Sequence, residues 1–421
     1  MNFSDVGTPT SDIPEAFWQE VRAAYPQQEP LLNLNNAAVS PPPLEVEQAV
    51  VDAYRLISHN PDVNMWSKLD AALPDIKAEL AQLIDCAPTE IALNRNSSEG
   101  LSTAIFGIPL QPGDEVLISP WDYPSARAGW LQRREREGIQ PVVCQFGLLD
   151  DDEAIIEAYS RAITPRTRVM LLTHMYHWNG RLLPVERLCA LARAHGIVTV
   201  VDGAQTFAQM PVSFRKLGCD IFITSLHKWL GAPVGNGMLV VREGLIDDTW
   251  PLLAPFDPPP LRIDKFDHWS LGTYNSAIQA GIMPAIRLHR RIGAERIQRR
   301  LSELTRYWIE RARDLPGFRL HTPLNAGPLD VGPLDARPLG AVALFSIDGV
   351  DSRQIERVLR EQHRVHVKYR RVEDIAGMRV SPHIYMRKDE LDVFVDALQA
   401  AVSSCGVSAA AFPAVSAAQD D

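Results

Sequence analysis

The chain has 421 residues, of which 46% are hydrophobic and 22% charged, and its formal net charge at pH 7 is −10. This composition excludes collagen, long coiled coils and disordered chains, and the length allows two or three domains with cores of their own. No stretch approaches the roughly 20 apolar residues that a membrane span needs, and the N-terminus lacks the basic and apolar regions of a signal peptide. We therefore expect a soluble, cytoplasmic protein with no membrane partner.

The charges and cysteines narrow the expected partners further. An acidic balance argues against nucleic acid, because a phosphate backbone attracts a basic face. The one dense basic cluster, Arg287 to Arg300, falls in a helical pattern and indicates a solvated helix face. The five cysteines show no CxxC pairing, so the sequence predicts neither a metal site nor a disulfide framework, and a reducing compartment fits.

Short apolar or β-branched runs alternate with helical patterns from about Thr89 to Val241. Stretches such as 184–195 have apolar residues at spacings of three and four, which indicates amphipathic helices. Alternating strands and helices predict βαβ units and a mostly parallel sheet that is covered on both faces. The predicted strands are 116–119, 141–146, 168–173, 197–201, 220–225 and 237–241.

The pattern changes after Val241. A Pro-rich connector at 251–260 precedes a long amphipathic helix whose apolar stripe contains Ile297, Leu301, Leu304 and Trp308. The sequence predicts a second, α+β domain from the elements that follow: a Pro/Gly-rich loop at 322–340, a strand at 341–347, a helix at 352–362, an alternating strand at 365–369 and a last helix from about 389.

Two of the predicted strands end in residues with a joint chemical use. One ends in Asp202, and the next runs into Ser225-Leu226-His227-Lys228 before a Gly-rich turn. In a parallel sheet both segments lie at the carboxyl edge, where open α/β folds bind ligands. Pyridoxal phosphate needs a lysine for a Schiff base and a carboxylate that keeps its ring nitrogen protonated. Each residue alone is more often a turn cap or a surface lysine, but together they predict this cofactor, with Lys228 and Asp202 as catalytic residues.

These segments resemble the cofactor site of the class V aminotransferase family, fold type I of the pyridoxal-phosphate enzymes. The family pattern of strand, D-x-A-Q/H, strand and S-x-H-K is met by D-G-A-Q at 202–205 and S-L-H-K at 225–228, and the resemblance extends over about residues 30 to 400. It implies an α/β fold, with a large domain whose mostly parallel, seven-stranded-type sheet is flanked by helices, and a smaller α+β C-terminal domain. The expected division is 1–45 for an N-terminal segment folding onto the small domain and active-site entrance, 46–265 for the large domain, 266–405 for the small domain and 406–421 for a disordered tail.

The resemblance also implies where the cofactor phosphate binds. N-S-S-E-G at 96–100 opens a helix and offers hydroxyls and backbone N–H groups together, so Ser97 and Ser98 are expected phosphate ligands. An ordinary serine N-cap would give the same local pattern. Gly272 and Thr273 resemble a loop that reaches the phosphate of the neighbouring subunit, which implies a homodimer with shared active sites. Further phosphate contacts are expected from Ser225 and His227.

The resemblance places several side chains around the cofactor ring. Tyr123, in W-D-Y-P at 121–124, is the expected stacking residue, because an aromatic ring on the open face fixes the ring plane. Trp121 as the stacking residue, or both as core residues, are the alternatives. Gln205 is expected to bond the ring hydroxyl. His177 occupies a position where relatives often place an asparagine beside the cofactor, and a packed surface histidine is its alternative.

Two further residues are expected to bind the substrate. Arg379, in R-V-S-P-H-I-Y, matches the family's R-x-S-x-H-x-Y segment, and the planar guanidinium suits bidentate recognition of a carboxylate. A lone arginine is more often a solvated charge. Asn36, in the N-L-N-N-A-A strip, resembles a segment that lines the substrate entrance.

The nearest resemblance within the family is to the isopenicillin N epimerase-like subgroup, through L-N-N-A-A, N-S-S-E-G, D-Y-P-S and R-V-S-P-H-I-Y. That subgroup mixes amino-acid epimerases, C–S lyases and enzymes of secondary metabolism. It implies an enzyme that acts at Cα of an amino acid or derivative through an external aldimine and a quinonoid, by epimerisation or by C–S or β-elimination, with Lys228 as the general base. The alternatives are an aminotransferase that passes through a pyridoxamine form, and a non-catalytic ligand-binding protein with the same fold.

Cysteine desulfurases, also members of the wider family, are disfavoured by the positions of the cysteines. Their chemistry needs a thiolate on a mobile loop of the small domain. The corresponding loop, 321–340, contains no cysteine, and Cys405 is expected beyond the last helix.

Overall fold

The computed structural model describes residues 13–26, 30–255, 257–267, 271–323 and 339–405. The large domain contains a seven-stranded sheet in the order β2-β8-β7-β6-β5-β3-β4. The pairs joining β4, β3, β5, β6 and β7 are parallel, and β8 is antiparallel to both of its neighbours. The strands are β2 (Ile91–Asn94), β3 (Glu115–Ile118), β4 (Gln140–Val143), β5 (Thr167–Thr173), β6 (Val198–Asp202), β7 (Ile221–Ser225) and β8 (Gly237–Val241).

The predicted mostly parallel sheet is confirmed, and the six predicted strands overlap β3 to β8. Residues of β6 and β7 alternate between two buried clusters. Val200 and Ile223 pack with side chains of α4 and α5, whereas Val201 and Phe222 pack in the cluster that includes α6 and α7. Because successive strand residues point to opposite faces, apolar runs of this kind need helices on both sides. The helices are α4 (Ser97–Gly107), α5 (Pro124–Glu137), α6 (Asp152–Ala162), α7 (Val185–Ala194), α8 (Phe214–Leu217) and α9 (Glu243–Ile246).

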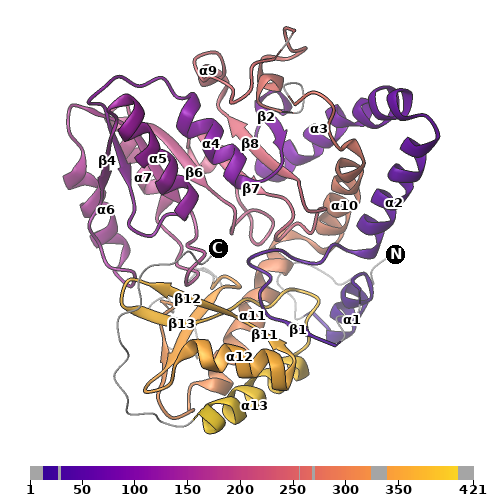
Figure 1. Ribbon diagram of the computed structural model, residues 1–421, viewed down its shortest axis with the longest axis vertical. Helices are drawn as coiled ribbons and strands as arrows, with labels where there is room; N and C mark the ends of the chain where they lie inside the picture. Colours follow the sequence, from indigo (N-terminus) through magenta and orange to yellow (C-terminus); the bar gives the residue numbers. More distant parts are fainter. Residues whose placement is uncertain (1–12, 27–29, 256, 268–270, 324–338, 406–421) are drawn as a thin grey trace.

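A helical layer packs beside β2 and β8 at the other end of the sheet (Figure 1). Its central helix α3 carries Lys77, a buried side chain whose amine bonds Asp264 and Asp267 at 2.6 Å each. The layer consists of α2 (Leu44–His59), the π-helix η1 (Val63–Leu69), η2 (Asp70–Ala72), α3 (Leu73–Ile84), η3 (Pro88–Glu90), η4 (Arg262–Phe266), η6 (Ser276–Gly281) and α10 (Ile282–Ile292).

The small domain has a four-stranded antiparallel sheet in the order β12-β13-β10-β9. The predicted helices and the strand at 341–347 are present, but the strand predicted at 365–369 is two strands, β11 and β12, that separate at Val367. Cys405 is the last residue of α13, so its expected position beyond the last helix is wrong. The elements are α11 (Ala294–Ala312), β9 (Phe318–Leu320), β10 (Ala343–Ile347), α12 (Ser352–His363), β11 (Val365–His366), β12 (Lys368–Val372), β13 (Ile375–Val380) and α13 (Lys388–Cys405).

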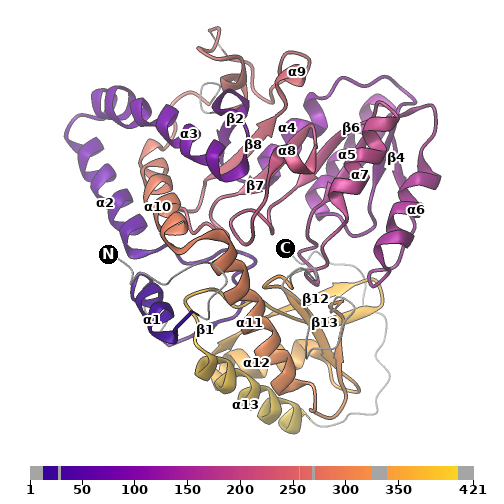
Figure 2. The ribbon, with the colours of Figure 1, turned by 180° about the vertical axis from the view of Figure 1, so that it is seen from behind.

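The N-terminal segment lies against the small domain in both ribbon views (Figures 1 and 2). Strand β1 (Leu32–Asn33) pairs in parallel with β11, and helix α1 (Glu15–Ala23) packs near α11 and α13. The guanidinium of Arg300 on α11 is buried and bonds both carboxylate oxygens of Glu15, at 2.8 and 3.0 Å. Arg22 forms an ion pair with Glu390. The domain division at 45, 265 and 405 stays a prediction, and the tail 406–421 lies outside the described residues, as does most of the loop predicted at 322–340.

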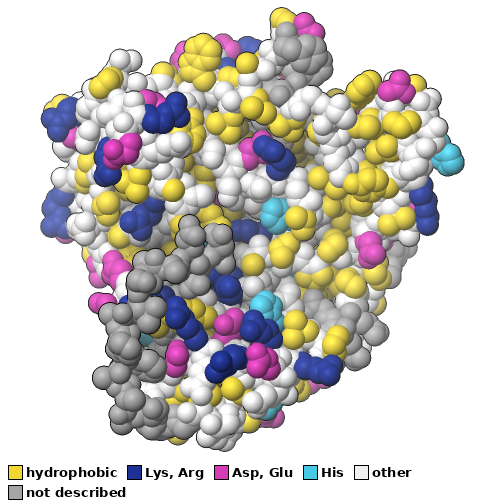
Figure 3. Space-filling model, in the orientation of Figure 1, with side chains coloured by type: hydrophobic (Ala, Val, Ile, Leu, Met, Phe, Trp, Pro, Cys, Tyr) yellow, Lys and Arg dark blue, Asp and Glu magenta, His cyan; other side chains and the backbone are white. Residues whose placement is uncertain are grey.

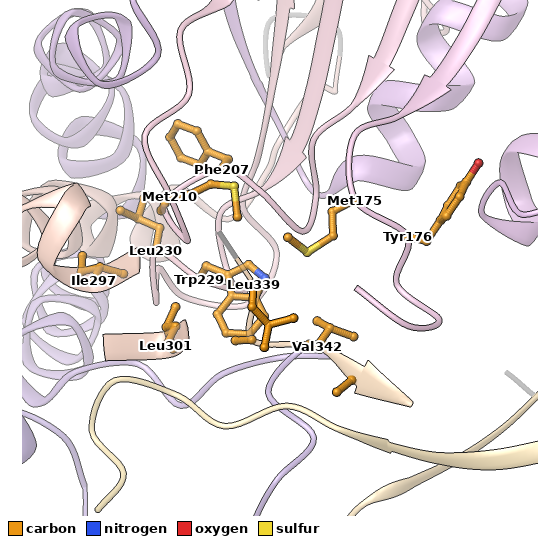
Figure 4. Close-up of a cluster of buried hydrophobic side chains, with 14 of the residues drawn as sticks. Met175, Tyr176, Phe207, Met210, Trp229, Leu230, Ile297, Leu301, Leu339 and Val342 are labelled. Carbon is orange, nitrogen blue, oxygen red and sulfur yellow. The ribbon is translucent and has the colours of Figure 1, made fainter. Parts of the chain in front are cut away.

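A shared apolar core joins the two domains. Figure 4 shows Trp229 and Leu230 from the large domain close to Ile297 and Leu301 from α11, and all four are buried. Burial of large apolar side chains from both sides stabilises one arrangement of the domains, at about 25 cal/mol per Å² of apolar surface removed from water. Among the described residues, no helix is both long and apolar enough to cross a membrane. The cytoplasmic location stays a prediction.

Candidate active site

The carboxyl edge of the large sheet brings Asp202 and Lys228 into electrostatic contact. Asp202 ends β6 and pairs in register with Thr173 of β5 and Ile223 of β7. Its carboxylate is buried and accepts a hydrogen bond from the backbone N–H of Ala204 at 2.9 Å. Burial raises the pKa of Asp202, while that N–H and the charge of Lys228 act in the opposite direction. Gly203 allows the turn, because a Cβ there would overlap the ring of Phe222.

Lys228 lies three residues after the end of β7 and is partly exposed. Burial lowers the pKa of its amine from 10.5 to about 8. The carboxylate of Asp202 opposes this shift, and the positive charges of Arg379 and Arg370 add to it. A larger share of neutral amine at neutral pH is what a nucleophilic or basic lysine requires.

The start of α4 forms a cradle of donors together with the end of β7. Asn96 caps the helix by accepting a hydrogen bond from the N–H of Glu99 at 3.0 Å, so the cap is not one of the two serines. Ser225 Oγ accepts from the N–H of Ser97 and donates to Ser97 Oγ, each at 2.9 Å. The hydroxyl hydrogen of Ser97 and the partly exposed Ser98 then remain as donors at a positive helix end.

His227 lies next to Lys228, two residues after the end of β7. It is partly exposed, and its Nδ1 lies 3.2 Å from the carbonyl oxygen of Asn236. Burial and the charge of Lys228 lower the pKa of His227. A proton on Nδ1 would bond this carbonyl and leave Nε2 as the ring nitrogen that a ligand can contact.

Aromatic side chains follow β3 and β5 at the same carboxyl edge of the sheet. Tyr123 is 38% exposed and meets the ring of His177 edge-on, with centroids 5.0 Å apart, whereas Trp121 is buried and its Nε1 donates to the carbonyl of Phe146 at 3.3 Å. An exposed ring at this edge is available for stacking, and a buried one is not. His177 is buried, and burial together with nearby cations lowers its pKa well below the usual range.

Gln205 and Asn36 have their polar atoms engaged within the protein. The amide nitrogen of Gln205 donates to the carbonyl of Ala37 at 3.0 Å, and its oxygen accepts from Trp229 Nε1 at 2.9 Å. Its amide keeps one further N–H for a ligand. Asn36 is buried, donates to the carbonyl of Ser381 at 2.9 Å and accepts from Tyr385 at 2.8 Å. Asn36 therefore joins the N-terminal strip to the small domain.

Arg379 is a buried guanidinium that meets no carboxylate of the described residues. Its Nη1 donates to the carbonyl of His177 at 2.9 Å and its Nη2 to Asn35 Oδ1 at 2.6 Å, while Nε is buried without a hydrogen-bond partner. Burial, with a contribution from Arg370, lowers the pKa of Arg379 to about 9. A desolvated charge with neutral partners is costly unless an anion joins it. The site is therefore suited to a ligand carboxylate.

Gly272 and Thr273 lie on the surface of the chain. Both are exposed, and a Cβ on Gly272, whose φ is +70°, would meet no atom within 4 Å. Their segment is anchored by Tyr274, whose hydroxyl donates to Asp70 at 2.5 Å. Their expected role toward a neighbouring subunit stays a prediction.

Three residues near the site were not predicted from the sequence. Asn35 accepts the bond from Arg379, Arg370 on β12 acts electrostatically on Lys228, His177 and Arg379, and Asp122 is buried beside Tyr123. Asn35 lies in the N-L-N-N-A-A strip next to Asn36, and Asp122 lies in W-D-Y-P next to Tyr123. Arg370 had no sequence signal, because its proximity depends on the pairing of β12 with β13.

The comparisons with known proteins decide the family. The Aminotransferase class-V family model matches residues 32–394, which is most of the chain. The chain belongs to the class V aminotransferase family. It is a pyridoxal 5'-phosphate-dependent enzyme, as the resemblance of its motifs implied, and the alternative of a non-catalytic ligand-binding protein is set aside.

Curated relatives of the class V chain include two activities. Isopenicillin N epimerase of Streptomyces clavuligerus is 28% identical over 400 residues, which cover 91% of this chain and 98% of that protein. Isopenicillin N epimerase of Amycolatopsis lactamdurans is 26% identical over 402 residues, with the same coverage. A probable cysteine desulfurase of Xylella fastidiosa strain Temecula1 is 25% identical over 410 residues, which cover 90% of this chain and 94% of the relative.

Solved structures agree on the fold. The cysteine desulfurase CsdA of Escherichia coli has a TM-score of 0.80 at 21% identity and covers 96% of this chain and 100% of that one. The cystine C–S lyase C-DES, in complex with its reaction product cysteine persulfide, has a TM-score of 0.78 at 20% identity, with coverages of 88% and 98%. These likenesses show the fold type I architecture of the class V chain.

The residues at this edge of the sheet fit pyridoxal 5'-phosphate. The site contains an amine of lowered pKa, a buried carboxylate, a helix start with hydroxyls for the phosphate and an exposed ring for stacking. The described residues contain no group of three or more His, Cys, Asp or Glu side chains arranged to hold a metal ion. In the view of Figure 3, His, Lys and Arg side chains lie along the boundary between the upper and lower parts of the molecule.

Proposed function

We propose that this enzyme acts at Cα of an amino acid or amino-acid derivative, by epimerisation or by C–S or β-elimination. When bound, the cofactor supplies an electron-accepting ring that stabilises negative charge at Cα. Two kinds of observation support the proposal. The curated relatives include isopenicillin N epimerases, and an amine of lowered pKa lies within electrostatic reach of a buried guanidinium that has no carboxylate partner among the described residues.

The chain's own residues have separable tasks in this proposal. Lys228 would hold the cofactor covalently and, as the free amine, would take the proton from Cα and return it. Asp202 would hold a proton on the ring nitrogen of the cofactor. Ser97, Ser98 and His227 would bind the phosphate, and Ser225 would orient the Ser97 hydroxyl through its hydrogen bond. Tyr123 and His177 would hold the ring plane, and Gln205 would bond the ring hydroxyl.

Arg379 is the residue that would select substrates with a carboxylate. Its guanidinium is fixed by two neutral acceptors, so it is already oriented when a substrate carboxylate arrives. A preorganised, desolvated cation binds a carboxylate more strongly than a mobile surface arginine does. The influence of Arg379 on the pKa of Lys228 supports a substrate that spans the two residues with its carboxylate and its Cα.

Incubation of the cofactor-loaded enzyme with single amino acids tests the proposed reaction. Epimerisation leaves a mixture of the two stereoisomers and no other product, whereas β-elimination releases ammonia, a keto acid and the β-substituent. Amino transfer would leave a keto acid and one equivalent of pyridoxamine 5'-phosphate per site, which would overturn the proposal in favour of the aminotransferase alternative. Chiral chromatography and the cofactor absorption spectrum distinguish these outcomes.

Persulfide chemistry is not part of the proposal, although desulfurases are among the relatives. The loop at 321–340 has no cysteine in the sequence, and Cys405 ends α13. Burial raises the pKa of the Cys144 and Cys219 thiols, which disfavours the thiolate that such chemistry needs. Release of sulfide from cysteine in the presence of a reductant, if lost when Cys405 is replaced by serine, would contradict this inference.

We further propose that the enzyme is a homodimer in which Gly272 and Thr273 of each chain reach the phosphate site of the other. Exposed apolar side chains on and near α2 support this, namely Val51, Tyr54, Val63 and Trp66. Apolar patches of this kind are typical of interfaces between subunits. Analytical ultracentrifugation should give twice the chain mass, and a monomer with full cofactor affinity would contradict the shared site.

A further inference from the structure

Asp122 is a buried carboxyl at the carboxyl edge of the sheet that the proposed reaction does not use. It lies four residues after the end of β3, in the turn that begins at Ser119, and is 1% exposed. One carboxylate oxygen accepts from the N–H of Ser119 at 2.7 Å, and the other accepts from Thr173 Oγ1 at 2.7 Å. Asp122 therefore ties the turn after β3 to the last residue of β5.

These hydrogen bonds connect Asp122 to two parts of the proposed cofactor site: the strand ends beside Asp202 and the turn that carries Tyr123. Thr173, which donates to Asp122, pairs in register with Asp202 on β6, so the two carboxyl groups lie on either side of one strand end. The residue after Asp122 is Tyr123, which is the N-cap residue of α5 and carries the exposed ring of the site. A charge at this position acts on Asp202 through a buried, weakly screened path.

The surroundings of Asp122 bring the pKa of its carboxyl group close to neutral pH. Burial raises its pKa from 3.8 to about 7, the donors Thr173 and Ser119 oppose this, and the carboxylate of Asp202 adds to it. Because Asp202 raises the pKa of Asp122, reciprocity requires the Asp122 carboxylate to raise the proton affinity of Asp202 and of groups bonded to it. The titratable and charged side chains that interact with Asp122 are Arg127 on α5, Cys144 after β4, Tyr159 on α6, Tyr176 after β5 and Asp202 on β6.

We propose that Asp122 is a positioning residue that acts through Asp202: held across the end of β5, its carboxylate strengthens the grip of Asp202 on the proton of the cofactor's ring nitrogen. The inference rests on the role proposed for Asp202. Its ionised form makes the site more negative beside that nitrogen, which favours the protonated, electron-accepting ring. The same hydrogen bonds hold the turn that presents Tyr123.

The test reads the ring nitrogen directly. The enzyme is loaded with cofactor labelled with ¹⁵N in the ring, and the chemical shift of that nitrogen is followed from pH 6 to 9. Asp122→Asn keeps the shape of the side chain and removes its charge. We expect the apparent proton affinity of the ring nitrogen to fall by about tenfold, the effect of one nearby buried charge. Thr173→Ser keeps the hydroxyl that donates to Asp122 and removes only a methyl group, so it should leave this affinity within about twofold of wild type.

Each outcome decides the matter. An unchanged nitrogen shift in Asp122→Asn would overturn the proposal, as would equal losses in Asp122→Asn and Thr173→Ser, which would indicate a structural role alone. If Asp122→Asn does not fold, the Asp122→Glu variant, which restores the charge, should return the wild-type shift, and its failure to do so would also overturn the proposal. Asp202→Ala is the reference: if it leaves the nitrogen shift unchanged, the role of Asp202 is wrong, and that failure is distinct from a failure of Asp122.

Discussion

Replacing Asp202 with asparagine should lower the pKa of the Lys228 amine still further in the cofactor-free protein. Burial takes this pKa from 10.5 to about 8, and the carboxylate of Asp202 is the largest influence that opposes the shift. At pH 7 the shift alone raises the neutral share of the amine by a factor of about 300. Loss of one opposite charge in a buried site is worth about one further pKa unit. The Lys228 amine of the Asp202→Asn variant should therefore be several-fold more reactive than that of the wild type at pH 7.

Competitive acylation measures this reactivity. Cofactor-free protein is treated with trace acetic anhydride between pH 6 and 10, and the modification of Lys228 is compared by mass spectrometry with that of surface lysines in the same sample. Arg370→Gln is the matched control, because Arg370 lowers the pKa of Lys228. Its loss should move the pH midpoint of Lys228 acylation upward. Unfolding would move both variants toward 10.5. A midpoint in Asp202→Asn that stays in place or rises would refute the electrostatic reasoning.

Three other substitutions test the substrate site and the packing. Arg379→Lys should raise KM for the amino acid by about 10 to 100-fold, since a charged hydrogen-bond pair is worth about 1.5 to 3 kcal/mol; steady-state kinetics with an unchanged KM would contradict this. Lys77→Met leaves Asp264 and Asp267 as buried charges without their cation and should lower the free energy of unfolding by about 3 to 5 kcal/mol in urea titrations. Trp308→Ala, in the core of the small domain, should cost about 3 to 5 kcal/mol by the same assay, and a loss below 1 kcal/mol would indicate a looser core than the structure has.

The large domain could be predicted because its strands are local apolar runs. Residues such as those of β5 to β7 are buried on both faces, so their sequences are continuously apolar and stand out between helices. Strand β13 could not be found in this way. It combines Gly377, Met378 and Arg379, and its strand conformation depends on pairing with β10 and β12, which is a long-range property.

The site shows the same division between local and long-range information. Asp202 and Lys228 could be predicted because one ends a strand and the other follows a strand end, each within a compact motif. Asp122 could not, because its importance depends on a hydrogen bond from Thr173, which is 51 positions away in the chain. Asn35 and Asn36 are adjacent, and the register of the strip against Ser381 decides which of them faces Arg379. Sequence motifs identify the segment, and tertiary contacts decide which side chain acts.

Exchange of the Cα proton tests the central claim most directly, because it isolates the step assigned to Lys228. Cofactor-loaded wild-type enzyme and a Lys228→Ala variant are incubated with a panel of amino acids in deuterated water, and deuterium at Cα is measured by mass spectrometry. We expect exchange for at least one amino acid with wild type and a loss of at least about 100-fold with Lys228→Ala, in line with the contribution of a general base. Exchange by Lys228→Ala at the wild-type rate would contradict it.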